Sequence, residues 1–277
     1  MRAKCFLGVL IAFCICFTGC GKSNVPENRV FAINDLTNKK VGVLEASTAE
    51  VYAADFGGDT AKLQVEKYPT LEEAVQALRR GDVDAVLGDD APASVFEGKY
   101  QSLRILDEVF MEESYAGIVA KKNWGLLDTV NMALIQMRTM GVYDSIFASY
   151  IGGSGDYHYK PDSASGPVLR IATNAEFPPY EFRTESGPQG IDIEIARYIA
   201  DFMERPLEIV DIDFDEIIAA VDSGKADIGL AAFSVTEERE RIVSFTDHYA
   251  KSKIVVIVRS GEEESTLQRI KDTLFGD

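Results

Sequence analysis

Two stretches of the sequence share one pattern: LEEAVQALRRGDVDAVL at 71–87 and FDEIIAAVDSGKADIGL at 214–230. In each, an amphipathic helix ends at a glycine, Gly81 or Gly224, as a helix C-cap with positive φ requires. After one further residue comes an apolar strand with Asp at its second position. The repetition of helix, cap and strand predicts two similar α/β lobes.

A short apolar strand precedes each of these units. The strand at 39–44 leads into the polar turn 46–48 and a helix, and the strand at 168–173 leads into 178–180 and another helix. Buried strands that alternate with helices form parallel sheets, and such sheets bind ligands beyond the carboxyl ends of their strands. We therefore expect a cleft where the strand ends of the two lobes face each other.

The N-terminus has the features of a secretory signal. Arg2 and Lys4 precede an apolar run, and the run ends at Phe17-Thr18-Gly19-Cys20. These four residues resemble the bacterial lipobox, whose cysteine is diacylated and becomes the first residue of the mature chain, although Phe17 stands where an aliphatic residue is usual. The alternative is an uncleaved anchor helix, for which the run is short.

Composition narrows the class of partner. Three of the four cysteines would leave with the signal, so only Cys20 remains, no disulfide forms and the core must hold the fold. A formal charge of −17 argues against nucleic acid and against an anionic lipid surface. We expect an extracytoplasmic protein anchored to the membrane by lipidated Cys20, in the periplasm or on the outer cell surface.

Arg239 is the candidate for recognising a carboxylate. It follows the strand of the second lobe, and a guanidinium matches a carboxylate with two parallel hydrogen bonds. Ser234 and amides at a helix start would complete the anion site. The alternative is that Arg239 belongs to a solvated charged face at 237–241.

Asp89 is the candidate for an ammonium group. It follows the strand of the first lobe, at the position equivalent to that of the anion site. The alternative is a turn-forming acidic pair with Asp90. Phe177 and Phe214 lie where two rings would enclose a small ligand, although aromatic residues at such positions are more often part of a core.

The sequence gives little support to an enzymatic function. His158 and His248 form no triad with a motif-bearing Ser or Cys, and no His, Cys or carboxylate group has metal-ligand spacing. The chain has no phosphate-binding glycine loop. We expect no catalytic residue, no metal and no cofactor.

Seven segments resemble the bacterial extracellular solute-binding proteins of family 3. They are KKVGVLEAST (39–48), YPTLEEAVQALRRGDVDAVLGDD (68–90), YAGIVAKK (115–122), MGVYDSIFASYIGG (140–153), IATNAEFPPYEF (171–182), QGIDIEIARYIA (189–200) and FDEIIAAVDSGKADIGLAAFSVTEERERIVSFTDHY (214–249). The resemblance implies an α/β fold of the type II periplasmic-binding-protein kind, with a ligand cleft between two lobes. It also implies a substrate-binding lipoprotein of an ABC importer that binds a polar L-amino acid and delivers it to a permease.

The same resemblance implies a set of ligand-binding residues. They are Arg239, Ser234, Ser47 and Thr48 for the ligand carboxylate, Asp89 for its ammonium, Phe177 and Phe214 for stacking, and Ala232, Leu44 and Asn174 as further contacts. Asn174 departs from the family, because members that bind cationic side chains, and some that bind glutamine, tend to have Asp there. This change favours a ligand with an uncharged polar side chain.

The order of the lobes also departs from the family, because the family's usual second lobe comes first here. We interpret this as a circular permutation with the following parts: signal peptide 1–19, lipid-anchored linker 20–34, usual second lobe 35–114, strand and helices returning to the usual first lobe 115–152, linker joining the old termini 153–166, usual first lobe 167–252, and crossing strand with C-terminal helix 253–277. A domain-swapped dimer or a fragment of a tandem array would also explain the order.

Two rival functions remain open on the same scaffold. One is an enzyme resembling the cyclohexadienyl dehydratases, for which Glu45 or Glu176 would be the acid–base residue. The other is a ligand sensor that acts through a membrane partner.

Overall fold

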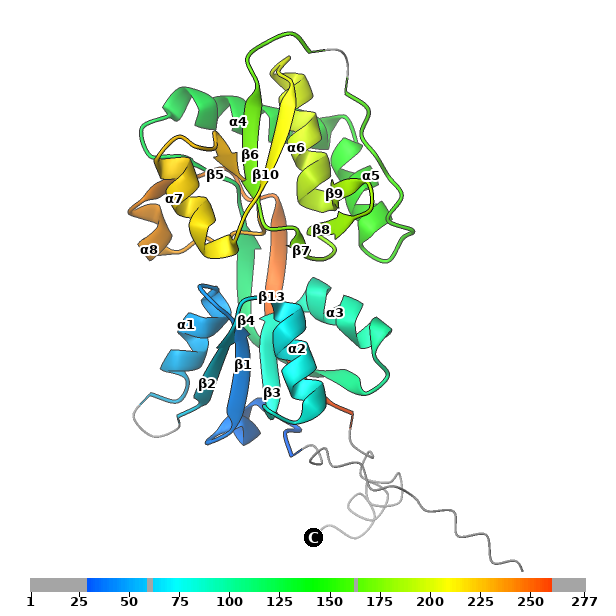
Figure 1. Ribbon diagram of the computed structural model, residues 1–277, viewed down its shortest axis with the longest axis vertical. Coiled ribbons are helices and arrows are strands. Elements are labelled where there is room, and N and C mark those ends of the chain that lie inside the picture. Colours follow the sequence, from blue (N-terminus) through cyan, green and yellow to red (C-terminus); the bar gives the residue numbers. More distant parts are fainter. Residues whose placement is uncertain (1–28, 59–61, 162–163, 261–277) are drawn as a thin grey trace, which may run out of the picture.

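The structure, a computed structural model, describes residues 29–58, 62–161 and 164–260. Two α/β lobes stand one above the other, and two long strands run between them (Figure 1). We call the lobe built around residues 40–99 the N-terminal lobe and the lobe built around 118–249 the C-terminal lobe. The predicted pair of α/β lobes is confirmed.

The N-terminal lobe is a five-stranded sheet with the order β2-β1-β3-β13-β4. The first three strands are parallel, and the last two join in antiparallel register. Its elements are η1 (Ile33–Leu36), β1 (Lys40–Leu44), α1 (Thr48–Asp55), β2 (Gln64–Tyr68), α2 (Leu71–Arg80), β3 (Ala85–Asp89), α3 (Asp90–Lys99), β4 (Leu103–Tyr115) and β13 (Ala250–Arg259).

The C-terminal lobe has a second five-stranded sheet with the order β10-β6-β11-β5-β12, beside a small three-stranded sheet. Its sheet strands are β5 (Ile118–Ala120), β6 (Leu169–Thr173), β10 (Leu207–Asp211), β11 (Ile228–Gly229) and β12 (Val243–Phe245), and the small sheet is β7 (Glu176–Phe177), β8 (Glu181–Thr184) and β9 (Gly187–Gln189). Its helices are α4 (Trp124–Thr139), α5 (Val142–Tyr150), α6 (Ile191–Phe202), η2 (Phe214–Glu216), α7 (Ile217–Asp222) and α8 (Glu237–Glu240).

The repeated unit forms as its sequence pattern predicts. Gly81 ends α2 with φ 84°, and Gly224 follows α7 with φ 75°, both in the left-handed region where glycine has no Cβ clash. The strands that follow, β3 and β11, are buried. Each unit therefore brings the carboxyl end of a buried strand to the side of its lobe that faces the other lobe (Figure 1).

Two strands connect the lobes. β4 and β13 pair along most of their length in the N-terminal sheet. At their lobe-facing ends the register continues, with Tyr115 opposite Ala250, and Tyr115 also bridges to Ser234 in the C-terminal lobe. Because few residues cross between the lobes, the pair of strands is the natural hinge for a motion that opens and closes them.

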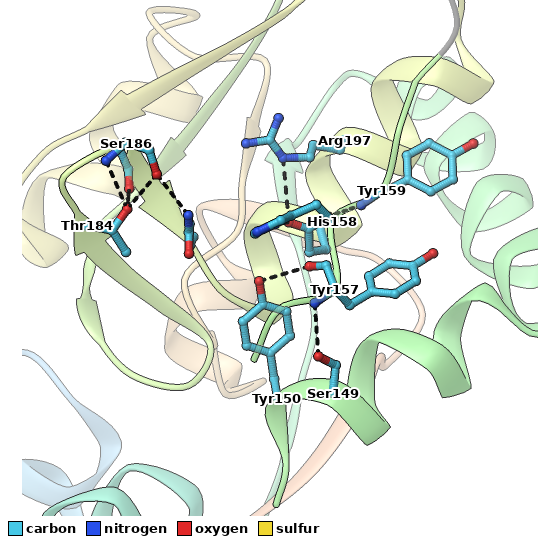
Figure 2. Close-up of polar contacts among 11 residues, drawn as sticks. Ser149, Tyr150, Tyr157, His158, Tyr159, Thr184, Ser186 and Arg197 are labelled. Carbon is cyan, nitrogen blue, oxygen red and sulfur yellow. Dashed lines mark hydrogen bonds and ion pairs between the residues drawn. The ribbon is translucent and has the colours of Figure 1, made fainter. Parts of the chain in front are cut away.

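The predicted linker 153–166 is a docked strap in its first half. Tyr157 N–H donates to Ser149 Oγ at 3.0 Å, Tyr150 donates to the carbonyl of Tyr157, and Tyr159 N–H donates to the buried carboxylate of Glu194 on α6 at 2.6 Å (Figure 2). Two tyrosine rings and a buried hydrogen-bond acceptor hold residues 157–159 against the lobe.

Two other elements start at different residues than expected. The end of the segment 20–34 packs against the N-terminal lobe, because Val30 is fully buried and a 3₁₀ turn starts at Ile33. The crossing strand begins at Ala250, three residues before 253. The signal peptide, Cys20 and the predicted C-terminal helix lie outside the described residues. Within the described part of the chain, no helix is both long and apolar enough to cross a membrane.

Candidate ligand-binding site

A cavity lies between the lobes, at the ends of their strands. All ten residues predicted to bind the ligand line it, together with Glu181 and Ala231: Leu44, Ser47, Thr48, Asp89, Asn174, Phe177, Phe214, Ala232, Ser234 and Arg239. Four of them come from the N-terminal lobe and the others from the C-terminal lobe.

Arg239 is buried and is held from both lobes. Its Nη1 donates to the carbonyl of Ser234 at 3.0 Å, and its Nη2 donates to the carbonyl of Ala46 at 2.9 Å. Thr236 caps α8 by accepting from Arg239 N–H, which fixes the backbone that carries the side chain. A guanidinium has five N–H groups, so donors remain for a ligand. Burial lowers the pKa of Arg239, but an arginine remains charged at neutral pH.

The turn that faces Arg239 begins helix α1. Ser47 is the N-cap: its Oγ accepts from Glu50 N–H and donates to the carbonyl of Leu44 at 2.6 Å. The only hydroxyl proton of Ser47 is therefore used inside the turn. Thr48, which is buried at the first turn of α1, keeps its hydroxyl and its orphan backbone N–H for an anion.

Ser234 already has a carboxylate partner within the protein. Its hydroxyl donates to Glu113 Oε2 at 2.8 Å, and the other oxygen of Glu113 is buried without a hydrogen-bond partner among the described residues. Ser234 has one proton to donate. It can hold a ligand carboxylate through that proton only after Glu113 releases it.

Asp89 ends β3 at the floor of the cavity. Tyr115 donates to its Oδ1, and Ser252 Oγ donates to the same oxygen at 3.0 Å. Burial between the lobes raises the pKa of Asp89 to about 7, against the lowering effect of these hydrogen bonds. An ammonium group beside Asp89 would favour the ionised carboxylate and so bring this pKa down.

The two aromatic residues predicted to enclose the ligand, Phe177 and Phe214, have different neighbours. Phe214 stacks on Phe233 with ring centroids 4.9 Å apart, and the guanidinium carbon of Arg239 lies 5.6 Å from the Phe214 ring. Phe177 is buried and stacks on Tyr180 at 6.4 Å. Both rings therefore have a face packed on the core of the lobe and also line the cavity.

Asn174 presents a hydrogen-bond acceptor at the cavity wall. Its Nδ2 donates to the carbonyl of Ile212 at 2.9 Å, so Oδ1 is the atom available to a ligand. The same residue, with Phe214, also lines an adjoining open pocket whose other polar side chains include Glu45, Glu73, Glu176, Asp213 and Asp215. Glu45 and Glu176, the candidate acid–base residues of an enzyme, therefore line this outer pocket and are not part of the cavity lining.

Sequence reasoning missed Glu181 and the residue that it faces, Asp192. Both carboxyl groups are almost fully buried, and Glu181 lines the cavity. The signal that would have found them is the placement of acidic residues inside the apolar segments PPYEF and GIDIEIA, where a buried carboxylate must find a partner. Within the described ranges, no group of three or more His, Cys, Asp or Glu side chains is arranged to hold a metal ion.

These features define a class of fold: two α/β lobes of the periplasmic-binding-protein kind, with a cavity at the strand ends between the lobes. Residues 169–274 match the model of the bacterial extracellular solute-binding proteins, family 3. This match covers less than half of the chain.

Several proteins are similar to parts of this chain. A probable histidine-binding protein of Neisseria gonorrhoeae is 30% identical over 124 residues, which cover 44% of this chain and 46% of the relative. The arginine-binding extracellular protein ArtP of Bacillus subtilis is 29% identical over 38% of this chain and 40% of its own length. The virulence sensor protein BvgS of Bordetella pertussis is 26% identical over 69% of this chain and 17% of its own. The chain spans less than half the length of each of these relatives.

Among solved structures, the arginine-bound form of domain 1 from TmArgBP is 30% identical, with a TM-score of 0.29, and covers 39% of this chain and 90% of that chain. The GluR0 ligand-binding core in complex with L-glutamate is 8% identical, with a TM-score of 0.40, over 85% of this chain and 89% of that chain.

Proposed function

We propose that this chain is the extracytoplasmic substrate-binding component of an amino-acid ABC importer. The observation that carries the proposal is the pairing of opposite charges across one cavity, Arg239 from the C-terminal lobe and Asp89 from the N-terminal lobe. An α-amino acid carries a carboxylate and an ammonium on adjacent atoms, so it complements both ends of such a cavity. The named histidine- and arginine-binding relatives support the same class of ligand.

In this proposal Arg239 holds the ligand carboxylate with Thr48 and Ser234, and Asp89 holds the ammonium. Phe177 and Phe214 enclose the side chain, and Leu44, Ser47 and Ala232 complete the wall. Ligand binding replaces the bond from Ser234 to Glu113, and closure brings Arg239 against Ala46 as seen here. The ligand then links the two lobes and stabilises the closed form.

The ligand side chain is proposed to be polar and to donate hydrogen bonds. Asn174 offers an acceptor oxygen to it, and a neutral amide is compatible with an uncharged ligand such as glutamine. The carboxylates around the outer pocket favour a cationic side chain instead, as in the arginine- and histidine-binding relatives. Comparing the Kd for L-glutamine with the Kd values for L-arginine and L-histidine distinguishes an uncharged from a cationic ligand side chain.

We also propose that the chain is a circular permutant in which 153–166 joins the old termini of the C-terminal lobe. The docking of the strap on α6 supports this, because one chain then completes both lobes without a partner. A domain-swapped dimer is the alternative. Light scattering after size exclusion distinguishes a monomer from a dimer.

Anchoring through lipidated Cys20 and delivery to a permease belong to the same proposal. Their support is the lipobox-like sequence before Cys20 and the transport role of the family. Mass spectrometry of the membrane fraction, with Cys20→Ser as the control, tests the anchor. A lipid adduct that is absent in the variant supports it, and a chain that keeps residues 1–19 contradicts it.

A sensor is the second candidate, because the similarity to BvgS extends over 69% of this chain. In that role the same cavity would bind the ligand, and a membrane partner would read the closed form. Deleting the gene would then change gene expression in response to the ligand and leave its uptake intact. An importer shows the opposite pattern.

The deciding experiment is isothermal titration calorimetry against the twenty amino acids, followed by Arg239→Ala on the best ligand. We expect one bound ligand per chain and a loss of affinity of about 10²–10³-fold in the variant. No binding by any of the twenty, or unchanged affinity in Arg239→Ala, contradicts the proposed function. A turnover assay on the same samples tests the dehydratase-like alternative.

A further inference from the structure

Two carboxyl groups lie together beneath the ligand cavity. Glu181 begins β8, lines the cavity and is 1% exposed, and Asp192 is the second residue of α6 and is fully buried. The backbone N–H of Asp192 donates to the carbonyl of Tyr180 at 2.9 Å, which places Asp192 beside Glu181. No ion pair joins either of them to a cation among the described residues. Two ionised carboxylates in such a place would repel each other without compensation.

The hydrogen bonds around the pair leave two atoms without partners. Asp192 Oδ2 accepts from Ala232 N–H at 2.9 Å and from Tyr249 Oη at 2.8 Å. Asp192 Oδ1 and Glu181 Oε2 are buried and have no partner within the described ranges. Carboxylates accept but do not donate, so a single proton supplies the missing hydrogen bond between the two groups.

The pair is connected to the part of the site that touches the ligand. Ala232, which lines the cavity, has φ 48°, a left-handed conformation that is strained for a residue with a Cβ. The bond from its N–H to Asp192 holds this conformation. Tyr249 precedes β13, so the same carboxylate also contacts the start of a strand that crosses between the lobes.

We propose that Glu181 and Asp192 share one proton, and that this protonated pair is a positioning device that holds the Ala232 turn in its ligand-binding geometry. The proton resides on Glu181, and Asp192 remains the charged acceptor for Ala232 and Tyr249. The part of this inference that concerns affinity rests on the proposed function, whereas the shared proton does not.

The electrostatic surroundings support this distribution of the proton. Burial and the neighbouring carboxylate of Asp192 hold the pKa of Glu181 well above its usual range, whereas burial raises the pKa of Asp192 only to about 6. The other titratable groups that face the pair are Asp89, Tyr180 and Tyr249. Both tyrosines have raised pKa values and remain neutral donors at pH 7. Loss of the Glu181 proton at alkaline pH would place two charges side by side and release the turn.

The shared proton is tested without any ligand. We expect the infrared spectrum of the wild type at pH 8 to contain the C=O stretch of a protonated carboxylic acid, and Glu181→Gln to lack it. In ¹H–¹⁵N spectra, the Ala232 amide should titrate at alkaline pH in the wild type and not in Glu181→Gln. Equal spectra in both experiments overturn the inference, whatever the protein binds.

The effect on the ligand site is tested with L-arginine, L-histidine and L-glutamine as probes, each by calorimetry from pH 7 to 9.5. Glu181→Leu should weaken binding by about tenfold, because it leaves Asp192 Oδ1 unsatisfied. Glu181→Gln should recover most of this loss, because its amide donates to Asp192. The ratio of the wild-type Kd to the Glu181→Gln Kd should rise with pH.

The surface variant Glu208→Gln, which removes one exposed carboxylate, is the matched control and should keep the wild-type pH profile. A constant ratio between wild type and Glu181→Gln overturns the positioning role. If none of the three probes binds the wild type and the remaining amino acids also fail, the proposed function fails. The spectroscopic result still decides the shared proton in that case.

Discussion

Arg239 Nη2 donates a 2.9 Å hydrogen bond to the carbonyl oxygen of Ala46, and this contact joins the two lobes directly. Ala46 has φ 58°, and its N–H is held by Glu50 Oε2 at 2.8 Å. The left-handed turn aims the Ala46 carbonyl at the guanidinium. A residue that lines the cavity thus also joins the two lobes.

Replacing Ala46 by glycine should stabilise the ligand-free protein. Glycine adopts a left-handed φ without the Cβ clash, so we expect the free energy of unfolding in urea to rise by up to about 1 kcal/mol. The matched control is Ala54→Gly on the exposed face of α1, which should lose about 0.5–1 kcal/mol. If both variants lose stability equally, Ala46 does not occupy the left-handed turn in solution.

Asp89 should make stability and ligand binding respond to pH in opposite directions. Its folded-state pKa, about 7, is above the usual value of about 3.9 for Asp. The stability that protonated Asp89 contributes is therefore present below about pH 4 and is lost as the pH rises to about 7. An ammonium ligand needs the ionised form, so its affinity should rise over the same range.

Calorimetry at pH 6 in two buffers of different ionisation enthalpy measures this linkage. We expect ligand binding to release close to one proton from Asp89, and Asp89→Asn to abolish the release while weakening binding by about 10²-fold or more. Without ligand, Asp89→Asn should be more stable than the wild type at pH 8. Binding without proton release would show that Asp89 does not contact the ammonium.

The docked strap should depend on the buried carboxylate of Glu194. Besides Tyr159 N–H, this group lies 3.3 Å from His158 Nδ1 and 3.6 Å from Arg197 Nε (Figure 2). Glu194→Leu leaves these donors without an acceptor, so we expect a loss of about 2 kcal/mol in unfolding free energy and faster proteolysis within 153–161. The exposed Glu185→Leu is the control and should show neither change. Unchanged cleavage in Glu194→Leu would contradict the docked strap.

Asn174→Asp should shift ligand preference towards cationic side chains. The carboxylate adds attraction for a guanidinium, so we expect the ratio of the Kd for L-glutamine to the Kd for L-arginine to rise by about tenfold. The variant also loses the bond from Nδ2 to Ile212, which should lower stability by about 1 kcal/mol. Asn174→Ala loses the same bond without adding a charge, and it should leave the ratio unchanged. An equal shift in both variants would contradict a direct role of position 174 in selectivity.

The local sequence pattern was sufficient to predict the repeated helix–strand unit. Glycine at 81 and 224 ends a helix because only a residue without a Cβ adopts positive φ at no cost, and that reasoning needs no tertiary contact. The positions of the candidate side chains after strand ends followed in the same way, because parallel strands end at one edge of their sheet. The docking of the strap could not be predicted in this way, because Gly, Ser and Pro indicate a loop but not whether the loop packs against the lobe.

The sequence by itself determined the two α/β units and the strand ends that meet at the cavity, because these follow from hydrophobic periodicity and helix capping. Part of the residue set that lines the cavity was expected only from the resemblance to a known family. Only the tertiary structure decided how those side chains share their hydrogen bonds. Ser47 uses its proton within its own turn, Ser234 donates to Glu113, and Asp192 holds Ala232. The last two pairings join residues distant in the chain, and they form because folding removes the water that would otherwise satisfy each group.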